Sequence, residues 1–245
     1  MPITVQSSPA LKGSYALEEK LAVAQSLKYA EELRELYGAE RAQRRIAEDA
    51  LVRLEASYRT TVRALAAALE LRDDQTGAHA ERVTRLALRL TAHVAPELAS
   101  DPELEFGFLL HDLGKIGVPD AVVLKPGSLD PDELETMRSH VELGEQIVAR
   151  IPYLGGLARQ VISAHHERWD GKGYPRRLAG EDIPLPARIF AVVDAFDAMT
   201  NDRPYRRALP VAEALREIRS GSGTQFDPEV VEAFVFIAEH VDAAA

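Results

Sequence analysis

The chain has 245 residues and a formal net charge of −10, with 46% hydrophobic residues, 6% aromatic residues and no cysteine. This composition predicts a globular protein with an aliphatic core, and it excludes disulfides, iron–sulfur clusters, thiolate zinc sites and cysteine nucleophiles. The excess acid lies in residues 61–245, which carry twenty basic and thirty acidic side chains, whereas residues 1–60 carry nine of each. A nucleic-acid polymer is therefore not an expected ligand, because its phosphates need a basic surface.

The sequence also argues against membrane insertion and export. Its longest apolar runs, such as residues 233–238, fall far short of the roughly 20 residues of a membrane-spanning helix. The first residues lack the basic and apolar segments of a signal peptide. We therefore expect a cytoplasmic protein without a membrane span.

Residues 15–71 contain no proline and one glycine, Gly38, and are rich in strong helix formers. They predict a long helix that Gly38 splits or weakens. A heptad seam runs through the second half of this helix, at Leu51, Leu54, Tyr58, Thr61, Leu65 and Ala68. Two interpretations stay open: the helix packs on its own domain, or it pairs with a second copy as a dimeric stalk. We expect residues 1–60 to form a helical extension, with homodimerisation through it.

Shorter helices, separated by glycines and prolines, are predicted from residue 72 onward. Three of them begin at an aspartate N-cap followed by proline, at Asp101, Asp130 and Asp227. The expected helices are roughly 78–93, 102–113, 131–149, 155–166, 186–200, 210–218 and 228–238. No segment alternates long enough to predict a strand. The expected fold class is all-α: a helical bundle over residues 61–245 that follows the N-terminal extension.

Histidines and aspartates are the candidate functional residues. A lone histidine on a helix is commonly a packed or surface residue, so the adjacent pair His165 and His166 carries more weight. Neighbouring helical residues point about 100° apart, so both rings reach one cluster only at a helix end or a distortion. Asp194 lies in an otherwise apolar helical stretch, where a buried carboxylate needs a partner such as a metal ion. Asp197 lies on nearly the same face, with a cap or a salt bridge as its ordinary alternative.

Five ordered motifs lie between about residues 60 and 240. They are Thr76-Gly-Ala-His79-Ala-Glu-Arg82-Val83, His111-Asp112-Leu-Gly114-Lys115-Ile-Gly117-Val-Pro119, His140 with Gly144, His165-His166-Glu167-Arg168-Trp169-Asp170-Gly171-Lys172-Gly173-Tyr174-Pro175, and Asp194-Ala-Phe-Asp197 with Asn201-Asp202-Arg203-Pro204-Tyr205-Arg206. Together they resemble the HD-GYP domain, a branch of the HD phosphohydrolase superfamily. The resemblance implies a compact helical domain that hydrolyses cyclic di-GMP to the linear dinucleotide pGpG and, in some members, to GMP.

The resemblance also implies a centre of two or three metal ions, with iron or manganese as the expected elements. The ligands that it implies are His79, His111, Asp112, His140, His165, His166 and Asp194. Members with a third metal place a glutamate four residues before the first ligand histidine, where this chain has Gln75. We therefore expect two metal ions: one held by His79, His111, Asp112 and Asp194, the other by Asp112, His140, His165 and His166.

Two cations about 3.5–4 Å apart neutralise phosphate oxygens and make a water molecule more acidic. Asp112, with two oxygens, is the expected bridging ligand. Lys115 is expected to donate to a phosphate oxygen as charge develops, with a surface lysine as the alternative. Asp197 is expected to exchange a proton near the metals or to orient a ligand histidine; both roles stay open.

Arg203 and Arg206 match positions that contact the dinucleotide in the family, and each guanidinium suits a phosphate or a guanine edge. Surface ion pairing is their alternative. Tyr174 is expected to pack against a guanine or against a protein, since its turn resembles the loop proposed to bind GGDEF-type cyclases. Other substrates stay open, namely a different cyclic dinucleotide or a nucleotide ester, as does a non-catalytic module that binds cyclic di-GMP or a partner.

Overall fold

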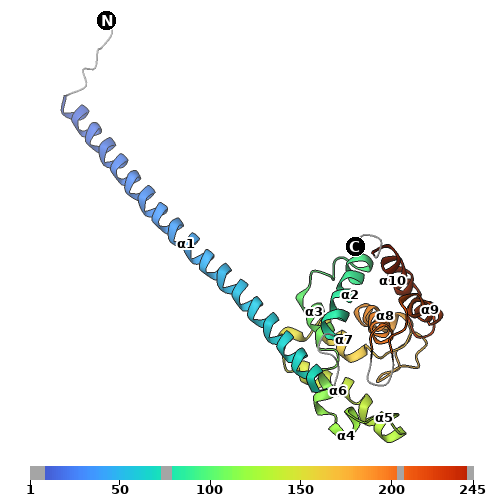
Figure 1. Cartoon of the computed structure of the whole chain (residues 1–245). Coiled ribbons are helices and arrows are strands. Elements are labelled where there is room, and N and C mark those ends of the chain that lie inside the picture. The colour runs from blue at the N-terminus through green and yellow to red at the C-terminus, as the bar shows by residue number, and fades with distance from the viewer. Residues whose placement is uncertain (1–8, 73–78, 203–206, 242–245) are drawn as a thin grey trace. The chain divides into compact units, whose positions relative to one another are not determined.

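The computed structural model describes residues 9–72, 79–202 and 207–241 of the chain (Figure 1). Within these residues all regular elements are helical, and the one β-type contact is an isolated bridge between Ser222 and Phe226. The predicted all-α fold class is confirmed. Among the described helices, none combines the length and the apolarity that crossing a bilayer requires. The expected location in the cytoplasm stays a prediction.

Ten α-helices and three short 3₁₀ helices follow one another along the described residues. In chain order they are α1 (Pro9–Arg72), α2 (His79–Val94), α3 (Pro102–Leu109), η1 (Leu113–Gly117), α4 (Asp120–Val123), α5 (Pro131–Arg138), α6 (His140–Val148), η2 (Pro152–Leu154), α7 (Leu157–Ala164), η3 (Gly180–Asp182), α8 (Leu185–Thr200), α9 (Val211–Ser220) and α10 (Pro228–Val241).

The chain divides into two compact units, residues 1–58 and residues 59–245. In the first unit, α1 carries exposed side chains at every position from Glu18 to Tyr58. The helix continues through Gly38 without a break, contrary to one of the two predicted outcomes. A glycine costs an exposed helix interior about 1 kcal/mol relative to alanine, and the strong helix formers on both sides outweigh that cost.

The end of α1 belongs to the second unit and packs one face against it. Val62, Ala66 and Glu70 are buried, and their four-residue spacing places them on a single face of the helix. Leu65 of the heptad seam is 50% exposed. The seam is therefore not the face by which this part of α1 packs on its own domain.

Helix α3 lies between two hydrophobic clusters of the second unit. Its Leu104 and Phe108 belong to a cluster with α2, α7, α8, α9 and α10, whereas Phe106 and Leu109 belong to a cluster with the end of α1. The ring of Phe108 stacks on Phe190 of α8 at 5.3 Å. Burial on both sides fixes the end of α3, from which the first candidate ligands project.

Two predicted helices are shorter than expected, and both breaks occur at candidate ligands. The helix predicted over 102–113 ends at Leu109, because the chain turns before η1. The helix predicted over 131–149 is divided into α5 and α6 at Ser139, whose hydroxyl donates to the carbonyl oxygen of Thr136 at 2.7 Å. His140 consequently stands at the start of α6.

Candidate metal centre

The turn after α3 places His111 and Asp112 against the start of α6. Gly114 makes this approach possible, because a Cβ atom at that position would lie 1.7 Å from the carbonyl oxygen of His140. Lys115 follows in η1, and its Nζ lies 2.9 Å from Oδ2 of Asp112. Residues three apart eclipse one another in a 3₁₀ helix, which accounts for this contact.

Two groups of potential ligands meet beside this turn. The first, here called the His79 group, consists of His79, His111 and Asp194. Nε2 of His79 lies 3.4 Å from Oδ1 of Asp194, and the rings of His79 and His111 meet edge to face at 5.6 Å. The ligand atoms of the group all lie within 4.8 Å of one another, a spacing that a single metal ion can bridge.

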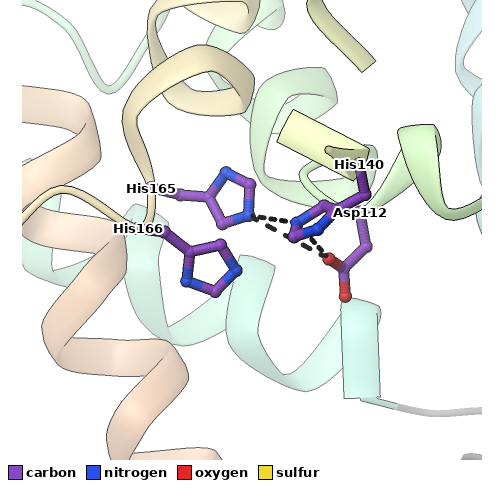
Figure 2. A group of neighbouring side chains, drawn as sticks. All are labelled: Asp112, His140, His165 and His166. Atoms are coloured by element: carbon purple, nitrogen blue, oxygen red, sulfur yellow. Dashed lines mark hydrogen bonds and ion pairs between the residues drawn. The ribbon is translucent and has the colours of Figure 1, made fainter. Parts of the chain in front are cut away.

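The second, here called the His140 group, consists of Asp112, His140, His165 and His166, and Figure 2 shows these four side chains converging. Nε2 of His140 lies 3.3 Å from Oδ1 of Asp112, and Nε2 of His165 lies 4.0 Å from it. Helix α7 ends at Ala164. The adjacent histidines therefore follow a helix end, which is one of the two positions from which both rings can reach the same cluster.

Asp112 contacts both groups through different oxygens. Its Oδ2 lies 3.1 Å from Nε2 of His111, while its Oδ1 faces His140. The hypothesis that one carboxylate serves both groups agrees with this geometry. The neighbouring side chains form two groups, with Asp112 in the His140 group and its Oδ2 also near His111. That these groups are two metal-ligand sets sharing Asp112 stays a prediction.

The imidazole rings are oriented so that Nε2 faces the centre. Nδ1 of His111, His140 and His165 lies 2.9, 2.7 and 2.9 Å from the carbonyl oxygen three residues earlier. Each Nδ1 therefore donates, and each Nε2 carries a lone pair in the neutral ring. Nε2 of His140 and Nε2 of His165 lie only 3.4 Å apart. Two facing acceptors beside a carboxylate are stabilised by a cation, so this donor set fits divalent metal ions.

Burial keeps three of the histidines uncharged. It lowers the pKa of His140, and it lowers the pKa of His165 strongly, with neighbouring histidines adding to the effect. Burial, with His140 nearby, lowers the pKa of His166 to about 4. Burial also opposes the charge of His111, but Asp112 outweighs it and raises the pKa of that ring. Neutral imidazoles are the form that ligates metal ions.

Asp197 lies behind His79, away from the centre. It accepts hydrogen bonds from Nδ1 of His79 at 2.7 Å, from Arg82 at 2.8 and 3.1 Å, and from Asn201 at 2.9 Å. Burial raises the pKa of Asp197, but the bonds from His79 and Arg82 outweigh it and lower the pKa to about 2. These contacts favour the orienting role among the two that the sequence left open.

The segment 167–178, here called the GYP loop, carries Tyr174 to the edge of the centre. The Tyr174 ring stacks on His166 at 4.7 Å, and the Arg138 guanidinium lies 5.1 Å from its centroid. Buried Glu167 holds the loop by accepting hydrogen bonds from the backbone N–H groups of Arg176 and Leu178, at 2.7 and 3.1 Å.

A groove of about 560 Å³ opens between the GYP loop and α5. Its lining includes Tyr174 and three cationic side chains, Arg138, Lys172 and Arg177, with Glu135 as the acidic one. In an acidic protein, this local excess of positive charge suits an anionic ligand. The groove borders the His140 group through Tyr174.

Three residues singled out from the sequence, Gln75, Arg203 and Arg206, lie outside the described residues. The structure brings together the other predicted site residues, with Lys115 and Tyr174 at the edge of the two groups. Sequence reasoning did not single out Arg138, Glu70 or Arg72, and it quoted Glu167 only as part of a motif. Glu70 and Arg72 are charged residues at the end of a helix, which is an ordinary surface pattern.

A family model described as an HD domain matches residues 63–230. The chain belongs to the HD domain family. The matched segment contains all seven predicted ligands. An HD domain implies dependence on divalent metal ions, and the two donor groups contain nitrogen and oxygen atoms that could hold them.

Two curated relatives are similar over most of the chain. A cyclic di-GMP phosphodiesterase of Thermotoga maritima is 45% identical over 174 residues, covering 70% of this chain and 47% of the relative. A 3'3'-cGAMP-specific phosphodiesterase 2 of Vibrio cholerae is 38% identical over 194 residues, covering 78% of this chain and 36% of the relative. The chain thus spans less than half the length of each.

A solved structure shares the fold of this HD domain. An HDG"Y"P protein from Bdellovibrio bacteriovorus superposes with a TM-score of 0.54 at 22% identity, covering 66% of this chain and 51% of that chain. The likeness supports the helical architecture alone. The family match confirms the predicted membership in the HD superfamily, and the curated relative named a cyclic di-GMP phosphodiesterase agrees with the predicted resemblance to HD-GYP domains.

Proposed function

We propose that this HD domain is a metal-dependent phosphodiesterase that hydrolyses cyclic di-GMP to linear pGpG. The observation that carries the proposal is the position of Asp112, which offers one oxygen to each of two histidine-rich donor groups. Paired sites of this kind suit in-line displacement at phosphorus. The Thermotoga maritima relative bears the name of this activity.

Two divalent cations are part of the proposal. The His79 group with Asp112 would hold one, and the His140 group would hold the other. Imidazole and carboxylate donors without thiolates suit iron or manganese. When bound, the cations supply positive charge for the phosphodiester oxygens and make water a stronger acid.

In the proposed reaction, water adds a hydroxyl group to one phosphorus and the bond from that phosphorus to the ribose 3′ oxygen breaks. The 3′ oxygen takes up the second proton of the water, which balances the reaction. Lys115 lies beside Asp112 and is proposed to donate a hydrogen bond to a phosphate oxygen as negative charge develops. Asp197 is proposed to hold His79 in the ligating orientation.

The groove beside the GYP loop is the proposed binding place for the rest of the dinucleotide. Its three cationic side chains match the second phosphate, and Tyr174 offers an aromatic edge to a guanine. Arg203 and Arg206 are proposed to add further contacts on the basis of their motif positions. Product analysis distinguishes pGpG from GMP, the product of a second hydrolysis.

A second candidate substrate is another cyclic dinucleotide. The observation in its favour is a relative, 38% identical, named for 3'3'-cGAMP. Such a substrate carries the same two phosphates, so the donor groups would act on it in the same way. Contacts to the bases would then determine whether cyclic di-GMP or the other dinucleotide is preferred.

Two partners complete the proposal. A second copy is proposed to pair along the seam of α1, because Leu51, Leu54 and Tyr58 are 46–56% exposed and buried apolar area drives helix pairing. Light scattering should report a dimer, and the double variant Leu51→Glu with Leu54→Glu should disrupt it.

A GGDEF-type cyclase is proposed to contact the GYP loop, where Lys172 is exposed. Co-purification of the cyclase with the parent and with the Lys172→Glu variant tests this contact.

The proposed activity is tested on the full chain by metal analysis, followed by incubation with cyclic di-GMP or 3'3'-cGAMP and nucleotide chromatography. Bound metal with faster conversion of cyclic di-GMP to pGpG is the expected result. Faster conversion of 3'3'-cGAMP indicates the second substrate. A chain that binds cyclic di-GMP without metal and without turnover is a binding module, and the proposal is then wrong.

A further inference from the structure

The carboxylate of Glu70 is buried at the end of α1, where the residue is 8% exposed. It accepts a hydrogen bond from the backbone N–H of Ala80 in the first turn of α2. The first N–H groups of a helix have no partner within the helix, so a carboxylate there stabilises the helix start. His79 immediately precedes Ala80. The bond therefore fixes the backbone from which the His79 ring projects.

Arg72, two residues further on, holds a different segment. Its guanidinium donates to the backbone carbonyl oxygens of Lys115 and Val118, the latter at 2.6 Å, and to Oδ1 of Asp120 at 2.6 and 3.0 Å. The Lys115 carbonyl oxygen also accepts the N–H of Val118 at 3.0 Å, and Val118 caps the end of η1. Arg72 therefore adds side-chain hydrogen bonds to the end of a turn that its own backbone already closes. η1 directly follows Asp112 and contains Lys115.

The last turn of α1 thus contacts both backbone segments on which the centre depends. Residues two apart on a helix project about 200° apart, so Glu70 and Arg72 reach opposite sides of the turn. Glu70 also lines a small cavity of about 20 Å³ together with His79, His111 and Asp112. Neither Glu70 nor Arg72 is a member of the His79 group or of the His140 group.

We propose that Glu70 and Arg72 are positioning residues that set the distance between His79 and the segment that carries Asp112 and Lys115. The inference rests on the proposed function for its kinetic consequences, but its effect on metal affinity is independent of the substrate. Groups that orient ligands typically change metal affinity or activity by about 10- to 100-fold when they are removed.

The Glu70 half of the inference is tested by Glu70→Gln and Glu70→Asp in the full chain. Glutamine keeps the reach and the acceptor oxygen without the charge, whereas aspartate keeps the charge and shortens the reach by one methylene. Positioning predicts that Mn²⁺ affinity, measured by calorimetry, stays within about threefold of the parent in Glu70→Gln and falls at least about tenfold in Glu70→Asp. The opposite order shows that the charge matters rather than the contact, and it overturns the inference.

The Arg72 half is tested by Arg72→Ala, with Asp120→Ala as the matched control. Asp120→Ala removes the exposed ion pair and leaves both carbonyl contacts available, so Mn²⁺ affinity and turnover should stay near those of the parent. Arg72→Ala should lower Mn²⁺ affinity and kcat by about tenfold or more while KM changes by less than about threefold, because the groove is not touched. Equal behaviour of the two variants overturns this half.

Failure of this inference is distinguishable from failure of the proposed function. If the parent does not hydrolyse cyclic di-GMP but the variants lose Mn²⁺ affinity in the stated order, the inference holds and the function is wrong. If the parent hydrolyses cyclic di-GMP and all four variants bind Mn²⁺ as the parent does, the inference is wrong. Circular dichroism and melting temperature show that each variant is folded at the temperature of the measurement.

Discussion

His79 is held in the centre by a different means from His111, His140 and His165. In the His140 group, His140 and His165 each use the carbonyl oxygen three residues earlier, at 2.7 and 2.9 Å. His111 follows the same local pattern within the His79 group. His79 instead contacts Asp197, 118 residues further along the chain, at 2.7 Å. Of the five rings, three are oriented by their own turns, His166 stacks on the ring of Tyr174 at 4.7 Å, and His79 depends on a carboxylate far along the chain.

This difference predicts where the centre is vulnerable to substitution. A backbone carbonyl group remains when the residue that bears it is changed, so the orientation of His140 and His165 is insensitive to single substitutions nearby. The orientation of His79 rests on one carboxylate, that of Asp197. The two groups should therefore respond differently when single side chains are removed.

The largest expected effect is that of Asp112→Ala, because this residue contacts both groups. Loss of a ligand common to both removes charge from each site at once. We expect metal content to fall at both sites and hydrolysis of cyclic di-GMP to drop by about 1000-fold or more, with helical content unchanged. Asp132→Ala, an exposed carboxylate on α5, is the control. Full activity in Asp112→Ala would contradict the role as common ligand.

The next effect is that of Asp197→Ala, which should weaken only the His79 group. Loss of the partner that orients His79 should lower the affinity of one of two Mn²⁺ sites by about 10- to 100-fold. Because the pKa of Asp197 is about 2, the carboxylate is ionised from pH 5.5 to 8.5. The loss of activity should therefore be independent of pH over that range.

A pH-dependent defect in Asp197→Ala would instead indicate that Asp197 exchanges a proton with the substrate or with water. Titration of metal content distinguishes the two roles as well, since a proton carrier can be removed without loss of metal. If the Asp197→Ala variant still binds two Mn²⁺ ions per chain at limiting Mn²⁺, other contacts hold His79 in place.

Local features of the site could be predicted from the sequence. The N-caps at Asp101 and Asp130, each followed by proline, mark the observed starts of α3 and α5. The angle between neighbouring helical residues required the adjacent histidines to lie at a helix end or a distortion, and α7, which was expected to run to residue 166, ends at Ala164. Each of these features is determined by a few consecutive residues.

Features that depend on contacts between distant segments could not be predicted. The break at Ser139 separates two stretches that both favour helix. The position of His140 depends on the close approach of η1 to α6, which Gly114 permits. Buried Glu70 resembles a surface residue of a long charged helix until its contact with α2 is known. The role of Asp197 stayed open for the same reason, because two of its three partners, His79 and Arg82, lie more than a hundred residues away.

The two groups should also differ in their response to acid in the metal-free protein. The lowered pKa values of His140, His165 and His166 mean that the unfolded chain binds more protons than the folded chain between pH 6.5 and about 4. The free energy of unfolding should therefore fall as the pH drops, by about 2 kcal/mol at pH 5 for a shift like that of His166. The raised pKa of His111 acts in the opposite direction.

Three histidines have lowered pKa values and one has a raised pKa, so the lowered values dominate. The chelator-treated protein should therefore melt at a lower temperature at pH 5 than at pH 7.5. His166→Gln removes one of the groups and should reduce this difference, whereas His240→Gln, an exposed histidine outside the site, should leave it unchanged. A melting temperature that does not change between the two pH values would contradict the burial of neutral imidazoles in the His140 group.

The smallest expected effect is that of Arg138→Ala in the groove, which borders the His140 group and not the His79 group. The Arg138 guanidinium lies over the Tyr174 ring and donates no hydrogen bond to a proposed ligand in the described residues. Its removal should raise KM for cyclic di-GMP by about three- to tenfold, the value of one exposed charge contact with phosphate, with kcat and Mn²⁺ affinity unchanged. The increase should shrink at high salt, because screening weakens an exposed charge contact. Arg159→Ala, whose guanidinium contacts Glu145 at 2.8 Å, is the matched control. A fall in kcat would place Arg138 at the reacting phosphate, and the groove would then be part of the centre.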